Sequence, residues 1–306
     1  MGIIVTSVFI LFVLIFLGFY SGKKGLIRQE TAPDFSALIL RITMPATVFL
    51  AIVGQDAAKL TDSLVIMPAI VLYHVLTLLF GILITRGSRI PQKQKGVWIY
   101  NSSFSNNGFM GLPLALAIFG NEGLILMALG NAVSNFLMFS VGTKLLTSGT
   151  AQDTRIGLRQ TVFNNINLAV IAGFAFCLIG IPVPEAFSSL LTYLANITSG
   201  LSMIVVGLSM SRYPFRDVFT SRFSYMVSAL RLLVIPLLTL LVLKLLPVEI
   251  PDMQKSILIL TAALPSSAAQ TMLAEQYHGD VRLTGRAVFM STMFSLVTVP
   301  LIMMLM

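Results

Sequence analysis

The chain has 306 residues, of which 56% are hydrophobic and only 10% are charged, and its mean hydropathy is +0.91. Soluble domains average roughly 45–50% apolar and about 25% charged residues, so this composition excludes an ordinary soluble protein. The formal net charge is +8. Because the basic residues follow the connections between apolar segments, we attribute this charge to membrane topology and not to nucleic-acid binding.

Ten apolar windows follow one another along the chain, each with about the 20 residues that cross a bilayer of roughly 30 Å. They predict an all-α integral membrane protein with ten transmembrane helices. The windows are 2–21, 35–54, 61–85, 97–119, 122–143, 163–181, 188–210, 222–246, 254–277 and 282–305.

The distribution of the 20 lysines and arginines tests this number of helices independently. Counted together with the window ends that border them, the odd-numbered connections hold 15 of them and the even-numbered connections hold three, while Arg41 and Arg231 lie deeper within windows. Short basic connections stay on the cytoplasmic side of a membrane. We therefore expect a multi-pass protein of the plasma membrane with both termini on the outer side.

The second half of the chain repeats the pattern of the first with an offset of 159 residues. Window 35–54 then falls on 194–213, and window 61–85 falls on 220–244. Each half holds five windows, an odd number, so the two copies must be inverted, as in many secondary transporters. The predicted domains are a first repeat at 1–146, a cytoplasmic linker at 147–160 and a second repeat at 161–306.

Helix-breaking residues interrupt the fourth and ninth windows at matching positions. The offset aligns Ser105-Asn106-Asn107-Gly108 with Leu264-Pro265-Ser266-Ser267. Glycine and asparagine favour non-helical backbone, and proline removes a helical hydrogen bond. Such backbone is tolerated at the bilayer midplane only where it is buried in protein or lines a cavity. We therefore expect two broken helices that meet at the midplane.

Each break also creates a helix N-terminus, whose free N–H groups and partial positive charge favour an anion. Four polar side chains at the breaks can cap these ends and still offer hydrogen bonds to a substrate. The alternative is that they only cap kinks and hold neighbouring helices together. The four are Asn106, Asn107, Ser266 and Ser267.

Several motifs resemble those of the auxin efflux carrier family, which includes plant PIN-type auxin exporters and bacterial malonate and malate carriers. Met110-Gly111-Leu112-Pro113-Leu114 is similar to the family's M-G-[IL]-P-L, and Asn106 stands where the family has its crossover asparagine. In the ninth window, Ala262-Ala263-Leu264-Pro265 and Ala274-Glu275-Gln276-Tyr277 resemble its A-A-L-P and A-[KE]-x-Y.

This resemblance implies that the fourth and ninth helices cross, that one bundle moves with the substrate in an elevator-like stroke, and that the protein is a homodimer. Gln270 replaces a proline of the plant members, and Ser105 replaces another. These departures favour a carboxylate smaller than auxin. The predicted substrate-binding residues are Asn106, Asn107, Gly108, Pro265, Ser266, Ser267 and Gln270.

Five further residues are candidates for coupling or accessory roles. His74 is a possible proton-coupling group or a structural histidine. Asn131 and Asn135 share a helix face and either line a site or bond a neighbouring helix. Arg231 meets an anion or a buried carboxylate, or extends toward the headgroups. Glu275 is the deepest of the acids and lies near a helix end, so none is expected at the midplane.

The leading prediction is a secondary transporter of a small organic anion of the malonate or malate class. The alternatives are an ion-coupled symporter of the bile-acid/sodium type, a channel and a membrane-embedded enzyme. The two histidines, His74 and His278, form no H-E-x-x-H motif, and the chain has no G-x-S-x-G. We expect no enzymatic activity, metal or cofactor, while the coupling ion, a proton or sodium, stays open.

Overall fold

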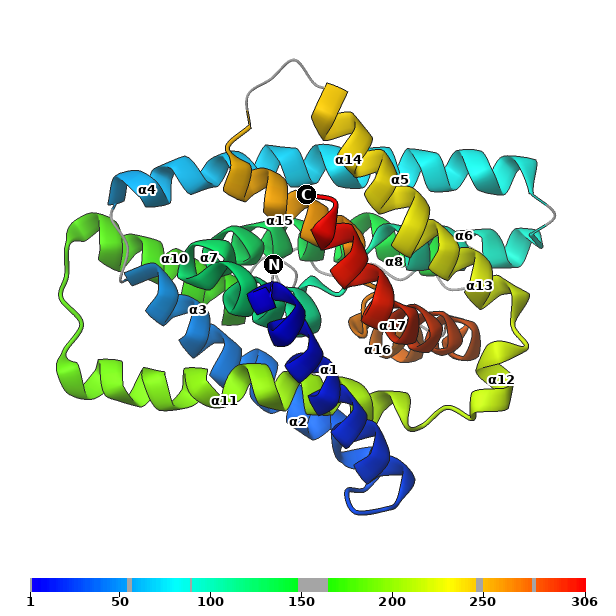
Figure 1. Cartoon of the computed structure of the whole chain (residues 1–306), viewed down its shortest axis with the longest axis horizontal. Coiled ribbons are helices and arrows are strands. Elements are labelled where there is room, and N and C mark those ends of the chain that lie inside the picture. Colours follow the sequence, from blue (N-terminus) through cyan, green and yellow to red (C-terminus); the bar gives the residue numbers. More distant parts are fainter. Residues whose placement is uncertain (1, 54–56, 89, 148–164, 246–249, 277–278) are drawn as a thin grey trace. The chain divides into compact units, whose positions relative to one another are not determined.

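The computed structural model describes residues 2–53, 57–88, 90–147, 165–245, 250–276 and 279–306 (Figure 1). Within these ranges every regular element is a helix, and the one extended pairing is an isolated antiparallel bridge between Ser105 and Ser266. The predicted linker at 147–160 falls outside the described residues except for Thr147.

The contacts of the chain divide it into two compact units. The first unit holds residues 1–67, 108–132 and 162–212. Its α-helices are α1 (Gly2–Lys23), α2 (Ala32–Leu38), α3 (Met44–Val53), α4 (Ala57–Asp62), α10 (Asn165–Ile179) and α11 (Glu185–Met210).

The second unit holds residues 68–107, 133–161 and 213–306. Its α-helices are α5 (Ile66–Gly87), α6 (Gln92–Ser103), α8 (Thr143–Thr147), α12 (Phe215–Phe219), α13 (Arg222–Ala229), α14 (Ile235–Leu245), α15 (Asp252–Ala263), α16 (Ala269–Gln276) and α17 (Val281–Met304). Helix α7 (Leu112–Leu137) begins in the first unit and ends in the second. Both units draw on both halves of the sequence, and the repeat boundaries stay a prediction.

Helix α7 consists of two helical segments joined by a turn at Gly120. This glycine has a φ of 67° and a ψ of −156°, a conformation that costs other residues steric strain. The turn lies between the predicted windows 97–119 and 122–143.

Four π-helical segments also occur in the described chain: η2 (Ile39–Thr43), η4 (Asn107–Gly111), η5 (Met138–Gly142) and η6 (Leu230–Val234). Three of them end two residues before a proline, at Pro45, Pro113 and Pro236. Proline has no N–H, and its ring clashes with the carbonyl one turn earlier. The preceding turn is therefore wider. The remaining short elements are the 3₁₀ turns η1 (Gln29–Thr31) and η3 (Ser63–Val65).

Six helical segments of the described chain are long and apolar enough to cross a membrane. Two shorter apolar helices, Phe9–Lys23 and Asn165–Ile179, lie in the first and sixth predicted windows. These features establish a multi-pass, all-helical architecture, whereas the number of ten stays a prediction. The six segments are Gln29–Val53, Leu60–Gly87, Asn107–Leu146, Glu185–Met210, Arg222–Leu245 and Val281–Met304.

In the first unit, α1 packs against α11 at backbone contact distance. A Cβ added at Gly18 would collide with the carbonyl oxygen of Ile204, and one at Gly207 with that of Ile15. Small residues allow such close approach between membrane helices. Helix α3 is joined to α11 by a hydrogen bond of 2.9 Å from the Thr47 hydroxyl to the Thr198 hydroxyl.

In the second unit the buried core surrounds α6. Trp98 lies in one apolar cluster with Tyr73, Val227, Ala262 and Ala287. A second apolar cluster contains Tyr100 of α6 and the adjacent Phe104. Their partners from other elements are Met138, Leu146, Leu273, Ala274 and Leu283. The last turn of α6, which directly precedes the predicted site, is thus held from several sides.

Candidate functional site

Two non-helical segments pair with each other in the second unit. Helix α6 ends at Ser103, and Phe104 is extended, with φ −112° and ψ 122°. Helix α15 ends at Ala263, and Leu264 has φ −64° and ψ 147°. The Asn106 N–H donates to the Pro265 carbonyl at 2.9 Å, and the Ser267 N–H donates to the Phe104 carbonyl at 3.3 Å. We call the segments 104–106 and 264–268 together the crossing.

Side chains in the second segment and in the first turn of α16 satisfy carbonyl groups at the end of α6. The Gln270 amide donates to the carbonyls of Tyr100 and Phe104 at 3.0 and 3.1 Å. The Ser266 hydroxyl donates to the carbonyl of Asn101 at 2.8 Å. The last carbonyls of a helix have no partner within it, so these bonds stabilise the interruption of α6. Ser266 and Gln270, both predicted to bind substrate, have this structural role.

Arg231 performs the same task at the end of α15. The side chain is fully buried, and its Nε and Nη2 donate to the carbonyls of Leu264 and Thr261 at 3.0 and 2.7 Å. Its Nη1 donates to the Tyr73 hydroxyl at 2.6 Å. The guanidinium therefore lies inside the protein against a helix C-terminus, where a positive charge is favoured.

A chain of hydrogen bonds joins Asn107 to His74. The Ser105 hydroxyl donates to Asn107 Oδ1 at 2.9 Å, and Asn107 Nδ2 donates to the Ser134 hydroxyl at 3.0 Å. That hydroxyl lies 2.7 Å from His74 Nε2. The His74 ring stacks on Phe104 with centroids 5.1 Å apart. His74 is thus part of the immediate surroundings of the crossing.

The Asn106 amide differs in its bonding from the side chains described above. The residue is 1% exposed, yet neither Oδ1 nor Nδ2 has a hydrogen-bond partner among the described residues. Gln270 Oε1, Ser103 Oγ and Asn101 Oδ1 are also buried without a partner in that part of the chain. Buried polar groups are almost always satisfied. The crossing therefore offers a concentration of unused donors and acceptors, which a polar ligand can take up.

The other predicted residues lie in three places. Asn131 is buried on α7 of the first unit, with its Oδ1 3.9 Å from where a Cβ on Gly108 would stand. Asn135 follows one turn later and is partly exposed. Glu275 belongs to α16, but its side chain is outside the described part, as is His278. Among the described residues no group of His, Cys, Asp or Glu could hold a metal ion.

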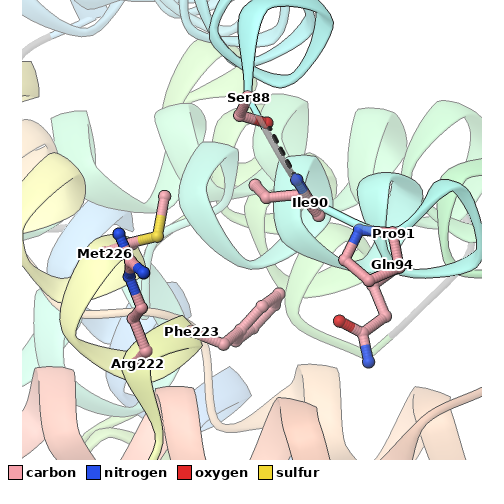
Figure 2. A pocket seen from close by; sticks show the side chains of 7 residues that line it. All are labelled: Ser88, Ile90, Pro91, Gln94, Arg222, Phe223 and Met226. Atoms are coloured by element: carbon pink, nitrogen blue, oxygen red, sulfur yellow. Dashed lines mark hydrogen bonds between the residues drawn. The ribbon is translucent and has the colours of Figure 1, made fainter.

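A separate pocket of about 490 Å³ opens between the start of α6 and the start of α13 (Figure 2). Pro91 and Gln94 line it from one helix, and Arg222, Phe223 and Met226 from the other. None of the predicted site residues contributes to it. Its lining is mainly apolar, with Arg222 as its charged residue.

Sequence reasoning missed Ser134 and Tyr73 as parts of the site. Ser134 lies 27 residues from Asn107 on another helix, and serines of this kind commonly bond their own helix. Tyr73 stands directly before His74, but nothing in the sequence indicates that it faces Arg231, 158 residues away.

Comparison with known proteins gives one family over nearly the whole length. Residues 3–303 match the membrane transport protein family, Mem_trans. An "Uncharacterized transporter" of Methanothermobacter thermautotrophicus is 28% identical over 94% of both chains. A "Putative malonate transporter" of Rhizobium meliloti is 24% identical over 94% of this chain and 91% of its own. The "Uncharacterized transporter YfdV" of Escherichia coli K12 is 21% identical over 94% and 93%.

These relatives share the full length of the chain, so the match concerns the whole protein and not a single motif. It confirms the resemblance to the auxin efflux carrier family seen in the sequence. The multi-pass helical architecture agrees with it. The chain therefore belongs to the membrane transport protein (Mem_trans) family.

Proposed function

We propose that this protein is a secondary transporter that binds a small carboxylate of the malonate or malate class at the crossing. The observation that carries the proposal is the buried Asn106 amide, whose two polar atoms have no partner among the described residues. An amide with a free N–H and a free carbonyl can bond a carboxylate or a substrate hydroxyl. In a membrane transporter, such a group at a break in two helices is the natural position for substrate.

The charges near the crossing support an anion as the substrate. The buried Arg231 guanidinium donates to the Leu264 carbonyl at the end of α15. The next carbonyl along the chain, that of Pro265, accepts from the Asn106 N–H. Helical backbone resumes at Asn107 and at Ala269, and helix N-termini carry partial positive charge. No Asp or Glu is buried among the side chains that the structure describes. The name of the Rhizobium meliloti relative agrees with a carboxylate.

The transport cycle that we propose follows from the repeat in the sequence and from the family. Ten spans form two inverted repeats of five, broken helices cross at the midplane, and one bundle carries the substrate by an elevator-like movement. Inverted repeats of this kind support alternating access, in which one bundle moves against the other. The protein acts as a homodimer in the plasma membrane with both termini outside.

The test is uptake of labelled malonate and malate into proteoliposomes by the wild type and by Asn106→Ala. We expect saturable uptake by the wild type and none by Asn106→Ala at equal protein incorporation. Asn165→Ala serves as the matched control, because this exposed asparagine bonds the Arg41 carbonyl in the first unit. Uptake is measured with and without inward proton and sodium gradients, which identifies the coupling ion.

Normal uptake by Asn106→Ala would move the site away from the crossing. Absence of uptake by the wild type would exclude both carboxylates, and competition with an indole acid then tests a larger substrate.

A further inference from the structure

Arg231 has a full charge in a buried position and no acidic partner among the described residues. It is the one Lys, Arg, Asp or Glu that is fully buried among the described side chains. Its three hydrogen bonds go to two backbone carbonyls and to the Tyr73 hydroxyl, all of them neutral acceptors. An ion pair between Lys255 and Asp252 is exposed and lies elsewhere on α15.

The helix end that Arg231 caps offsets only part of this charge. A helix C-terminus corresponds to roughly half a negative charge, so about half a positive charge stays uncompensated. A buried charge is costly unless it is paired. Arg231 lies on the π-helical segment η6, which ends two residues before Pro236. Single π-helical turns are frequent at functional sites.

The position of the charge connects it to the crossing. Arg231 Nε bonds the Leu264 carbonyl, and the next carbonyl along the chain, that of Pro265, accepts the Asn106 N–H. Each of the three guanidinium nitrogens already donates a hydrogen bond within the protein, so Arg231 does not need to touch a ligand at Asn106. Its electrostatic field still extends there, since a buried charge is weakly screened.

We propose that Arg231 is the fixed counter-charge that makes the crossing selective for anions, acting through its field and not by direct contact. The inference rests on the proposed function and specifies it: the site prefers a carboxylate over the neutral amide of the same shape. Arg231 is thus a specificity-determining residue, while Asn106 supplies the contact.

Substitution of Arg231 separates its charge from its hydrogen bonds. Arg231→Lys keeps the charge, and Arg231→Gln keeps a donor amide but removes the charge. The measured quantity is the ratio of inhibition constants of malonamide and malonate against labelled malonate uptake, at one fixed pH. We expect Arg231→Lys to keep the ratio within about twofold. We expect Arg231→Gln to lower this ratio of inhibition constants about tenfold. This is the effect of removing one unit charge at a distance on the order of 10 Å and an effective dielectric constant of about 20.

Substitution of Tyr73 neutralises the charge while the arginine and its helix cap remain. Tyr73→Glu places a carboxylate beside Arg231, and Tyr73→Gln is the matched neutral control that still offers an acceptor. We expect the ratio to fall about tenfold in Tyr73→Glu and to be retained in Tyr73→Gln. This pair keeps the proposal testable even if Arg231→Gln does not fold, which size-exclusion chromatography of each variant establishes.

Two results would overturn the inference. The first is an unchanged ratio in both Arg231→Gln and Tyr73→Glu, with all ligands weakened equally, because Arg231 would then be only a helix cap. The second is a loss of the ratio in Arg231→Lys, since the charge is retained there. If the proposed function is wrong, the wild type itself takes up no malonate and no malate. The ratio of inhibition constants then cannot be measured for any variant, which distinguishes this outcome from the two above.

Discussion

Asn106 and Gln270 are both buried amides at the crossing, but their bonding differs. The Gln270 Nε2 caps two carbonyls at the end of α6, while both polar atoms of Asn106 are unpaired within the described chain. Leaving a buried polar group unsatisfied costs about 1–3 kcal/mol. Gln270 therefore stabilises the end of α6, and we propose that the Asn106 amide binds substrate.

This difference gives a pair of opposite expectations for thermal unfolding in detergent. Asn106→Leu removes unsatisfied atoms, so its Tm should equal or exceed that of the wild type while transport is lost. Gln270→Leu leaves the Tyr100 and Phe104 carbonyls without their bonds and should lower the free energy of unfolding by about 1–3 kcal/mol. A clear drop in Tm for Asn106→Leu would show that the amide is needed for folding and contradict its assignment as a free substrate group.

Ser134 should position Asn107, although it is not expected to touch substrate. In Ser134→Ala, Asn107 Nδ2 and His74 Nε2 both lose a partner, so we predict a several-fold higher KM for malonate with a smaller change in the maximal rate. Ser134→Thr keeps a hydroxyl and should restore the KM. Ser140→Ala is the control, because its hydroxyl bonds only carbonyls of its own helix. Equal KM values for Ser134→Ala and Ser140→Ala would exclude the role.

Among the helices, the ends of α6 and α15 could be predicted from residues that disfavour helical backbone. The pattern of Asn, Gly and Pro marks 105–108 and 264–267 as the weakest parts of two apolar windows, and in the structure α6 ends at Ser103 and α15 at Ala263. The partners of each helix end could not be predicted, because Arg231 and Gln270 reach them through tertiary contacts. The sequence predicts Gln270 as a substrate-binding residue, but nothing in it indicates that the side chain caps the end of α6.

The packing of α1 on α11 allows a prediction with two glycines of the same helix. Gly207→Ala should destabilise the protein by more than 1 kcal/mol, since the new Cβ would overlap the Ile15 carbonyl and overpacking costs about 1–3 kcal/mol. Gly200→Ala has its nearest neighbour at 4.0 Å and should be neutral or slightly stabilising, because alanine favours helices. Tm values of the two variants provide the measurement, and equal values would contradict the close approach.

At the scale of the whole molecule, composition alone predicted a multi-pass helical protein, and the helical structure and the family match confirm it. The inverted repeat, the ten spans and the orientation of the termini stay predictions from hydropathy and charge. Length and hydropathy alone do not establish the number of spans, because a window such as 254–277 consists of two helices that are each too short to cross a bilayer.

Labelling of single cysteines tests the orientation. Cys177 is replaced by serine, and cysteine is then introduced at Arg28 or at Asp252, both of which are exposed. An impermeant maleimide added to intact cells should label Asp252→Cys, in an even-numbered connection, and not Arg28→Cys, in an odd-numbered one. The reverse pattern would invert the predicted topology, and labelling of both or neither would contradict the number of spans between them.

Counterflow distinguishes a carrier that binds its substrate at Asn106 from a channel and from a carrier with another site. Proteoliposomes are loaded with unlabelled malonate and diluted into a trace of labelled malonate. We predict a transient accumulation of label inside the vesicles with the wild type and with Asn165→Ala, and none with Asn106→Ala. Label that only equilibrates in the wild type would indicate a channel, and accumulation by Asn106→Ala equal to that of the wild type would contradict the site.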